Sequence, residues 1–191
     1  VVTSTTVDAI IKIGGTDYVT FDGIDMVDAV TNISTTTRME FGYAILKASG
    51  TNGSQNIVIK NCKIGLFSVY TSTIGINNAN HTTAITTSLV VTSTAGANSN
   101  NKFFGNTIDS AYIGIQVAGY ADAISPYTYY DQNNEIGVTA ANTINNFGGG
   151  AFTAYGVYAI YQNGIKVANN TITGGSHGTL LHTGTLYGIF M

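Results

Sequence analysis

Two short phrases alternate along the chain, and their repetition constrains the fold more than any other sequence feature. The first phrase combines an apolar alternation, a polar turn and another apolar residue, and the second places a small residue among apolar ones. Copies of the first phrase lie at 18–26, 56–64, 102–108, 141–144 and 165–172. Copies of the second phrase lie at 42–46, 74–76, 113–117, 155–158 and 187–190. Strict alternation is expected when each turn of a solenoid contributes at least two short strands.

When the chain is aligned by the first phrase, five apolar residues fall at one equivalent position: Met26, Ile64, Ile108, Ile144 and Ile172. Such a column suits stacked coils, because the inward side chains of one coil can be buried only by its neighbours. In segment 57–59, the period-two alternation points Ile57 and Ile59 inward and Val58 outward. Asparagine at the bends tolerates unusual backbone angles and can stack its amide on the next coil. We therefore predict an all-β solenoid of stacked strands.

The spacing between equivalent positions is uneven, which predicts an irregular coil with loops at certain corners. The candidate insertions are 28–40, 79–100 and 119–137. The apolar run 89–91 predicts a strand of its own within the second insertion. No linker divides the chain, so residues 1–191 are predicted to form a single segment. The strand phrase at 187–191 has no polar cap, so we expect an excerpt of a longer solenoid whose neighbours are further coils of the same polypeptide.

The composition narrows the class of protein. Charged residues make up 9 % of the chain and apolar residues 44 %, with a net charge of −3, so a disordered chain is not expected. The seven basic residues are scattered between Lys12 and Lys166 and form no stripe for nucleic acid. No apolar run approaches the ~18 residues of a membrane-spanning helix. Residues 1–5 lack signal-peptide features, so an export signal would lie upstream of this sequence.

Segment 15–24 and the Asn-Asn-Thr-Ile segment at 169–172 resemble repeats of large secreted and cell-surface proteins of the Bacteroidetes. Those proteins carry right-handed parallel β-helix repeats, and many resemble type IX secretion substrates with a C-terminal sorting domain. The resemblance implies a right-handed parallel β-helix with irregular loop insertions. It also implies an extracellular or cell-surface location, with an extracellular or cell-surface polysaccharide or protein as the partner.

Parallel β-helices include polysaccharide lyases and glycoside hydrolases, so catalytic candidates must be considered. Asp22 and Asp25 flank a bend and could form an acid/base pair or provide oxygen ligands for calcium. The alternative is a solvated, aspartate-rich turn. Arg38 and Lys60 are candidates for the base and the cationic group of a lyase, and solvated side chains are the alternative. These four residues are the catalytic candidates of the sequence.

No metal site is predicted, and no cofactor is implied beyond the weak possibility of calcium. The three histidines, at 81, 177 and 182, lack the tight spacing of metal ligands. The single cysteine, Cys62, excludes an internal disulfide and aligns with Ile24 of the first coil. Cys62 is therefore predicted to be a buried small hydrophobic residue rather than a nucleophile.

The tyrosine-rich stretch 120–130 is the clearest candidate for ligand contact. Tyr127, Tyr129 and Tyr130 could stack on sugar rings or contact a protein, and the alternative is that they cover the flank of the helix. The leading hypothesis is a non-catalytic extracellular β-helix segment that acts as a structural or adhesive scaffold. Alternatives are a polysaccharide lyase or glycoside hydrolase of the β-helix type, and a glycan-binding module without turnover.

Overall fold

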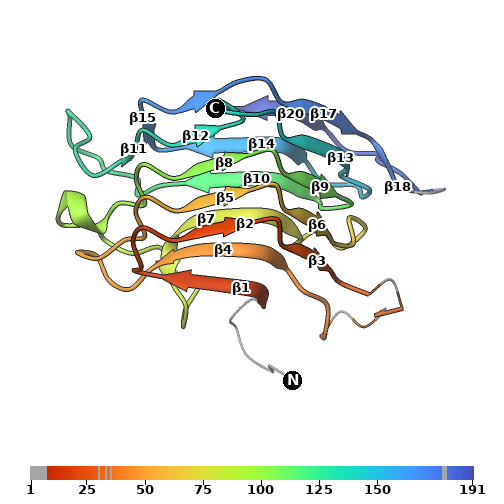
Figure 1. The fold of residues 1–191 in the computed structure, drawn as a ribbon, viewed down its shortest axis with the longest axis horizontal. Helices are drawn as coiled ribbons and strands as arrows, with labels where there is room; N and C mark the ends of the chain where they lie inside the picture. Colours follow the sequence, from red (N-terminus) through yellow and green to blue (C-terminus); the bar gives the residue numbers. More distant parts are fainter. Residues whose placement is uncertain (1–7, 30, 33, 35, 178–179) are drawn as a thin grey trace.

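The computed structural model describes residues 8–191 except 30, 33, 35 and 178–179. The described residues form β-strands, loops and one short 3-10 helix, η1 (Thr94–Gly96). Most strands belong to three parallel sheets, which we name A, B and C (Figure 1). The prediction of an all-β fold with parallel strands is therefore confirmed.

Sheet A contains β1 (Ala9–Gly14), β4 (Phe41–Lys47), β7 (Ile74–Thr82), β10 (Ile113–Ala118), β14 (Ala154–Ile160) and β20 (Leu186–Phe190). Sheet B contains β2 (Thr20–Asp22), β5 (Val58–Lys60), β8 (Lys102–Phe104), β12 (Glu135–Ile136) and β16 (Lys166–Val167). Sheet C contains β3 (Asp25–Val27), β6 (Lys63–Gly65), β9 (Thr107–Asp109), β13 (Thr143–Phe147) and β17 (Thr171–Gly174). Two small pairs complete the fold: β11 (Asp131–Gln132) with β15 (Gln162–Asn163), and β18 (Ser176–His177) with β19 (Leu180–Leu181).

The chain passes through sheets A, B and C in the same order, again and again. We call one such passage a circuit, so that β1, β2 and β3 form the first circuit and β4, β5 and β6 the second. Each strand pairs in parallel with the strand of the same sheet one circuit later. Successive circuits are therefore layered on one another, from the red N-terminal strands to the blue C-terminal strands of Figure 1.

The predicted apolar column forms the sheet C wall of the core. Met26 pairs with Ile64, Ile64 with Ile108, Ile108 with Ile144, and Ile144 with Ile172. The first four are buried, and Ile172 packs against the same core. In β5 and the residue before it, the isoleucines are buried and Val58 is only partly covered, as the alternation predicted.

The glycine of the second phrase allows sheet A to approach the isoleucine column. A Cβ atom on Gly114 would lie 2.6 Å from the Ile144 methyl group and 2.5 Å from the Gly156 carbonyl oxygen. The same contacts recur at Gly42, Gly75 and Gly156. Because one of the contacting atoms is backbone, any larger residue would force adjacent circuits apart.

The corner between sheets B and C is tight and holds the predicted asparagine ladder. The Asn106 side-chain amide donates to Asn142 Oδ1 (3.0 Å), and the Asn142 amide donates to Asn170 Oδ1 (2.9 Å). Asn106 Oδ1 also accepts a bond from the Cys62 backbone N–H (3.0 Å). Cys62 occupies the equivalent place in the second circuit and is fully buried, as predicted. The residue just before the ladder position has a positive φ in several circuits, for example Asn61 (55°) before Cys62. One residue therefore makes the bend, and the next residue forms the ladder.

The corner between sheets A and B varies in length and carries the longest loops. Within the predicted insertion 79–100, the run 89–91 forms no strand, so that prediction is wrong. The Leu89 backbone N–H donates to the Asn80 carbonyl oxygen (3.0 Å), and the Asn80 side chain donates to the Leu89 carbonyl oxygen (2.7 Å). The backbone groups of Leu89 are therefore satisfied within the loop and need no strand neighbour. The predicted insertion 119–137 is shorter than expected, because β11 and β12 lie within it.

Candidate functional site

A groove of about 250 Å³ opens at the A–B corner, near β11 and β15 at the left of Figure 1. It is lined by Gln55, Thr94, Ala95, Ser99, Asn100, Gln132 and Asn133. All these side chains are uncharged, and four of them carry amides. The lining therefore offers donors and acceptors without a net charge, which suits a neutral, hydroxyl-rich ligand.

Buried asparagines position the groove residues. Asn101 Oδ1 accepts a bond from the Ile57 backbone N–H (2.8 Å), and Asn134 Oδ1 accepts one from the Asn101 backbone N–H (2.9 Å). The residues immediately before them, Asn100 and Asn133, have φ values of 61° and 55°. Within the described part of the chain, no hydrogen bond engages the side-chain amides of Asn100 and Asn133. Both amides are therefore available to a ligand.

Tyrosines cluster at the 119–130 loop, which a hydrogen bond joins to the groove. The rings of Tyr127 and Tyr130 stack at 5.1 Å between centroids, and Tyr161 meets Tyr130 edge-on at 5.7 Å. The Gln132 side chain donates to the Thr128 carbonyl oxygen (3.1 Å), which ties this loop to the groove. Tyr127 is 44 % exposed and Tyr161 40 %. Desolvation, followed by the charges of Tyr127, Tyr161 and Asp122, raises the pKa of Tyr130.

The third predicted tyrosine faces a different pocket. Tyr129 lines a second pocket, of about 230 Å³, with Asp122 and Ile124, and its backbone N–H donates to Asp122 Oδ2 (3.2 Å). Of the predicted ligand-binding residues, the structure thus brings together Tyr127 and Tyr130. It adds Tyr161, which the sequence analysis did not single out. Tyr161 follows the fourth copy of the second phrase, so stacking of circuits could have placed it beside the tyrosine loop.

A second aromatic group lies along β14 and β20 of sheet A. Tyr155 stacks on Tyr187 (5.6 Å, 11°), and Tyr158 stacks on Phe190 (5.6 Å, 19°). Each pair joins one circuit to the next in register. Because these ring faces cover one another, they are not free to stack on a ligand. This aromatic group therefore contributes packing between circuits.

The predicted carboxylates are engaged in ion pairs between circuits. Asp22 Oδ2 lies 3.2 Å from Lys60 Nζ, and its Oδ1 accepts a bond from the Asn61 amide (2.8 Å). Asp25 Oδ2 lies 3.6 Å from Lys63 Nζ. The hydrogen bonds from Asn61 and Lys60 lower the pKa of Asp22. A carboxylate held in its charged form is a poor general acid.

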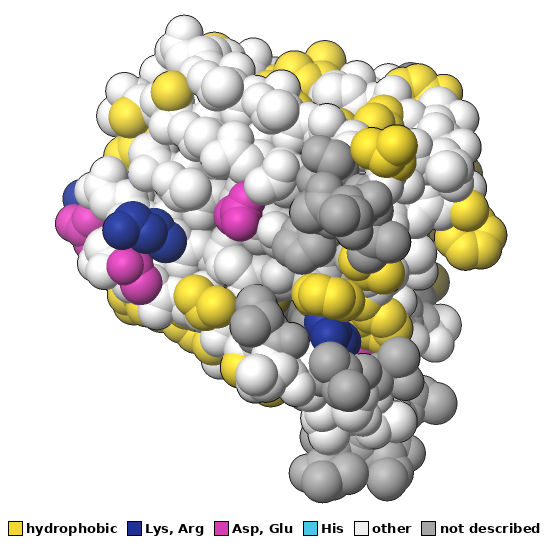
Figure 2. Space-filling view, turned by 90° about the vertical axis from the view of Figure 1, so that its right-hand side faces the viewer, with side chains coloured by type: hydrophobic (Ala, Val, Ile, Leu, Met, Phe, Trp, Pro, Cys, Tyr) yellow, Lys and Arg dark blue, Asp and Glu magenta, His cyan; other side chains and the backbone are white. Residues whose placement is uncertain are grey.

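Arg38 lies apart from solvent, in the loop before β4. Its side chain is 4 % exposed, and its guanidinium carbon lies 3.5 Å from the centroid of the Phe67 ring. Lys60, by contrast, is partly exposed on sheet B and pairs with Asp22. The arrangement therefore gives Arg38 a packing role against Phe67. Figure 2 shows how sparse charge is on another face of the molecule, where the backbone and uncharged polar side chains make up most of the described surface.

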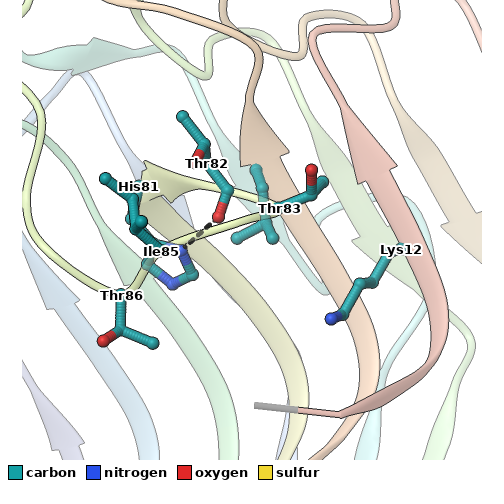
Figure 3. Close-up of a pocket in the computed structure, with 7 residues that line it drawn as sticks. Lys12, His81, Thr82, Thr83, Ile85 and Thr86 are labelled. Carbon is teal, nitrogen blue, oxygen red and sulfur yellow. Dashed lines mark hydrogen bonds between the residues drawn. The ribbon is translucent and has the colours of Figure 1, made fainter. Parts of the chain in front are cut away.

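A narrow pocket beside β1 brings a lysine and a histidine to one place (Figure 3). Lys12 and His81 lie on opposite sides of it, with Thr82, Thr83 and other residues between them. His81 Nδ1 is 2.8 Å from the Thr82 carbonyl oxygen, so this nitrogen carries a proton and donates. The lining residues include no carboxylate, so the pocket lacks the pair that glycoside hydrolysis requires.

No group of three or more histidine, cysteine or acidic residues in the described ranges is arranged to hold a metal ion. The side chain of His177 lies outside the described part of the structure. His182 Nδ1 accepts bonds from the backbone N–H groups of Gly149 and Gly150 (3.1 and 3.3 Å), which gives it a loop-organising role.

Comparison of the chain with protein-family models, with curated proteins and with solved structures gave no match. Among the described residues, no helix has the length and apolar character needed to cross a membrane.

Proposed function

We propose that the chain is a segment of a right-handed parallel β-helix, in which each circuit is one coil. The repeated A–B–C order, the parallel pairing and the three ladders of isoleucine, glycine and asparagine support this architecture. The right-handed sense follows the strong preference of parallel strand connections. We infer a secreted or cell-surface protein of the Bacteroidetes type IX class, on the resemblance of segments 15–24 and 169–172.

The segment acts as a non-catalytic adhesive scaffold that contacts a neutral extracellular polysaccharide at the A–B corner. The observation that carries this proposal is the uncharged groove with free Asn100 and Asn133 amides, which a hydrogen bond from Gln132 joins to the loop that holds the exposed Tyr127 ring. Amides exchange hydrogen bonds with sugar hydroxyls, and a tyrosine ring covers the apolar face of a sugar. A lyase or hydrolase is disfavoured, because the candidate carboxylates are committed to lysines.

The open edge of β20 is the place where a further coil would stack. Leu186, Tyr187, Ile189 and Phe190 are 37–46 % exposed there, whereas the corresponding positions of inner circuits are more deeply covered. A further coil bearing an aromatic residue opposite Tyr187 and another opposite Phe190 would continue the two aromatic stacks.

Size-exclusion chromatography with a panel of polysaccharides tests the function. The chain is incubated with neutral and with uronate polymers, and the glycan and the protein are both followed in the eluate. Co-elution with a neutral polymer that is lost in Tyr127→Ala supports the proposal. The matched control is Phe152→Ala, which removes an exposed ring (69 %) between sheets C and A and should retain co-elution.

Two other outcomes would contradict the proposal. Glycan that shifts to smaller sizes identifies an enzyme. Absence of co-elution with every polymer leaves only the structural scaffold.

A further inference from the structure

A lysine and an aspartate meet inside the A–B corner with no exposed side-chain surface on either. Lys47 lies at the end of β4 and Asp131 at the start of β11, 84 residues apart in the sequence. Lys47 Nζ and Asp131 Oδ1 are 3.4 Å apart. The other four ion pairs of the described residues lie at the surface and join neighbouring circuits.

The two oxygens of Asp131 have different surroundings. Oδ1 accepts a bond from the Asn98 backbone N–H (2.8 Å) and faces Lys47 Nζ. Oδ2 is buried and has no hydrogen-bond partner in the described part of the chain. Lys47 Nζ also donates to the Gly96 carbonyl oxygen (2.7 Å), which holds the amine in place. One oxygen of the carboxyl group is thus polarised by a donor, and the other is unengaged.

Burial drives both groups toward their neutral forms. Desolvation lowers the pKa of Lys47, although the charge of Asp131 opposes it. Desolvation also raises the pKa of Asp131, although Lys47, Asn98 and Gln162 oppose it. A neutral amine is a nucleophile and a neutral carboxylic acid is an electrophile, whereas an ammonium and a carboxylate do not react with each other.

We propose that Lys47 and Asp131 form an intramolecular isopeptide bond. The Lys47 amine attacks Cγ of the protonated Asp131 carboxyl group, and Oδ1, held by the Asn98 N–H, becomes the oxygen of the new amide. The Nζ–Cγ bond forms and the Cγ–Oδ2 bond breaks. Oδ2 leaves as water with its own proton and one proton from Nζ. No oxidant, metal or activated co-reactant is consumed.

The bond would join the second circuit to the fourth across the third. It would close a covalent loop of chain between these circuits, which restricts the unfolded state as a disulfide does. Asp131 lies between Tyr130 and Gln132, so the bond would also fix the floor of the groove. The proposal is independent of glycan binding, because it concerns the chain alone.

Mass spectrometry of the intact folded chain tests the proposal directly. The expected mass is lower than that of the sequence by one molecule of water. A tryptic digest should then contain one branched peptide that joins the residues around Lys47 to those around Asp131, with no cleavage after Lys47. A chain of full mass, or a loss of water without the branched peptide, would overturn the proposal.

Two comparisons complete the test, and neither depends on the stability of a variant. Lys47→Met should have the full mass of its sequence, and a loss of water in this variant would contradict the assignment. The exposed Asp22–Lys60 pair, at 3.2 Å, is the internal control. Its peptides should remain separate, because both side chains are open to solvent (Lys60 31 % and Asp22 51 % exposed), and a link there would contradict the requirement for burial.

Discussion

The two corners that flank sheet B differ in nearly every respect. The B–C corner spans only residues 23–24, 61–62 and 105–106 in the first three circuits, whereas the A–B corner spans 83–101 in the third. The B–C corner holds a ladder of like residues. The A–B corner holds the groove, the tyrosine loop and the buried lysine–aspartate pair. The corner that repeats from circuit to circuit thus stabilises the fold, and the corner that varies holds the candidate functional groups.

A substitution in the apolar core column should cause the largest loss of stability, and the effects at the two corners can be compared with it. Ile64→Asp should unfold the chain, because it buries an unpaired charge at a cost above about 4 kcal/mol. Thermal melting followed by circular dichroism measures the loss. Val58→Asp is the matched control, since Val58 points outward beside Lys102 and should melt near the wild type. A native-like melt of Ile64→Asp would refute the core assignment.

A substitution in the B–C ladder should have the next largest effect. Asn142→Ala removes the acceptor of two Asn106 bonds and the donor to the Phe103 carbonyl oxygen (2.9 Å). Stranding these buried groups should lower the free energy of unfolding by about 3 kcal/mol. Urea denaturation provides the measurement. A loss below about 0.5 kcal/mol would mean that the ladder contributes little, and the contrast between the corners would disappear.

The corresponding change at the A–B corner should alter binding and leave stability nearly unchanged. Asn133→Gly removes a free amide and suits the positive φ that Gly164 already adopts one circuit later. The free energy of unfolding should change by less than about 0.5 kcal/mol. Retention of the neutral polysaccharide should fall severalfold. Equal retention by the variant and the wild type would remove Asn133 from the groove's contact surface.

The smallest effect should be on the pH dependence of the free energy of unfolding, to which surface and buried carboxyl groups contribute with opposite signs. The folded pKa values of Asp22 and Glu135 are lowered by their hydrogen bonds to Asn61 and lysines, so the stability they contribute is lost as pH falls through those values. The folded pKa of Asp131 is raised by burial, so without the isopeptide bond its contribution falls as pH rises through that value.

Urea denaturation between about pH 6 and pH 3 measures the balance, and the contribution of Asp22, whose side chain is 51 % exposed, should be shallow. An Asp131 carboxyl group already converted to an amide does not titrate, so Asp131→Asn should leave the acid loss unchanged. A steeper loss in this variant would reveal a free Asp131 carboxyl group and would contradict the isopeptide bond.

The sequence predicted the repeated parts of the molecule and missed the unique ones. The column from Met26 to Ile172 was visible because each circuit places the same kind of residue at the same offset. The pairing of Lys47 with Asp131 was not visible, since it joins two non-repeated corners 84 residues apart. The run 89–91 has the composition of a strand, but Asn80 satisfies the Leu89 backbone, so composition alone misled. Tyr129 and Tyr130 are adjacent in sequence, but Tyr129 lines a pocket with Asp122 whereas Tyr130 packs against Tyr127 and Tyr161, a difference that only the loop conformation decides.

The glycine column has a consequence for the spacing of exposed groups in successive circuits. Because Gly42, Gly75, Gly114 and Gly156 leave no room for a side chain, sheet A stays close to the isoleucine column and successive circuits stay close to one another, whatever the length of the A–B loops. Exposed groups at one corner then recur at the strand spacing of about 4.8 Å. The amides of Asn100 and Asn133 belong to successive circuits and follow this spacing. Under the proposed function, the groove is therefore expected to favour polymers whose units repeat at a commensurate length.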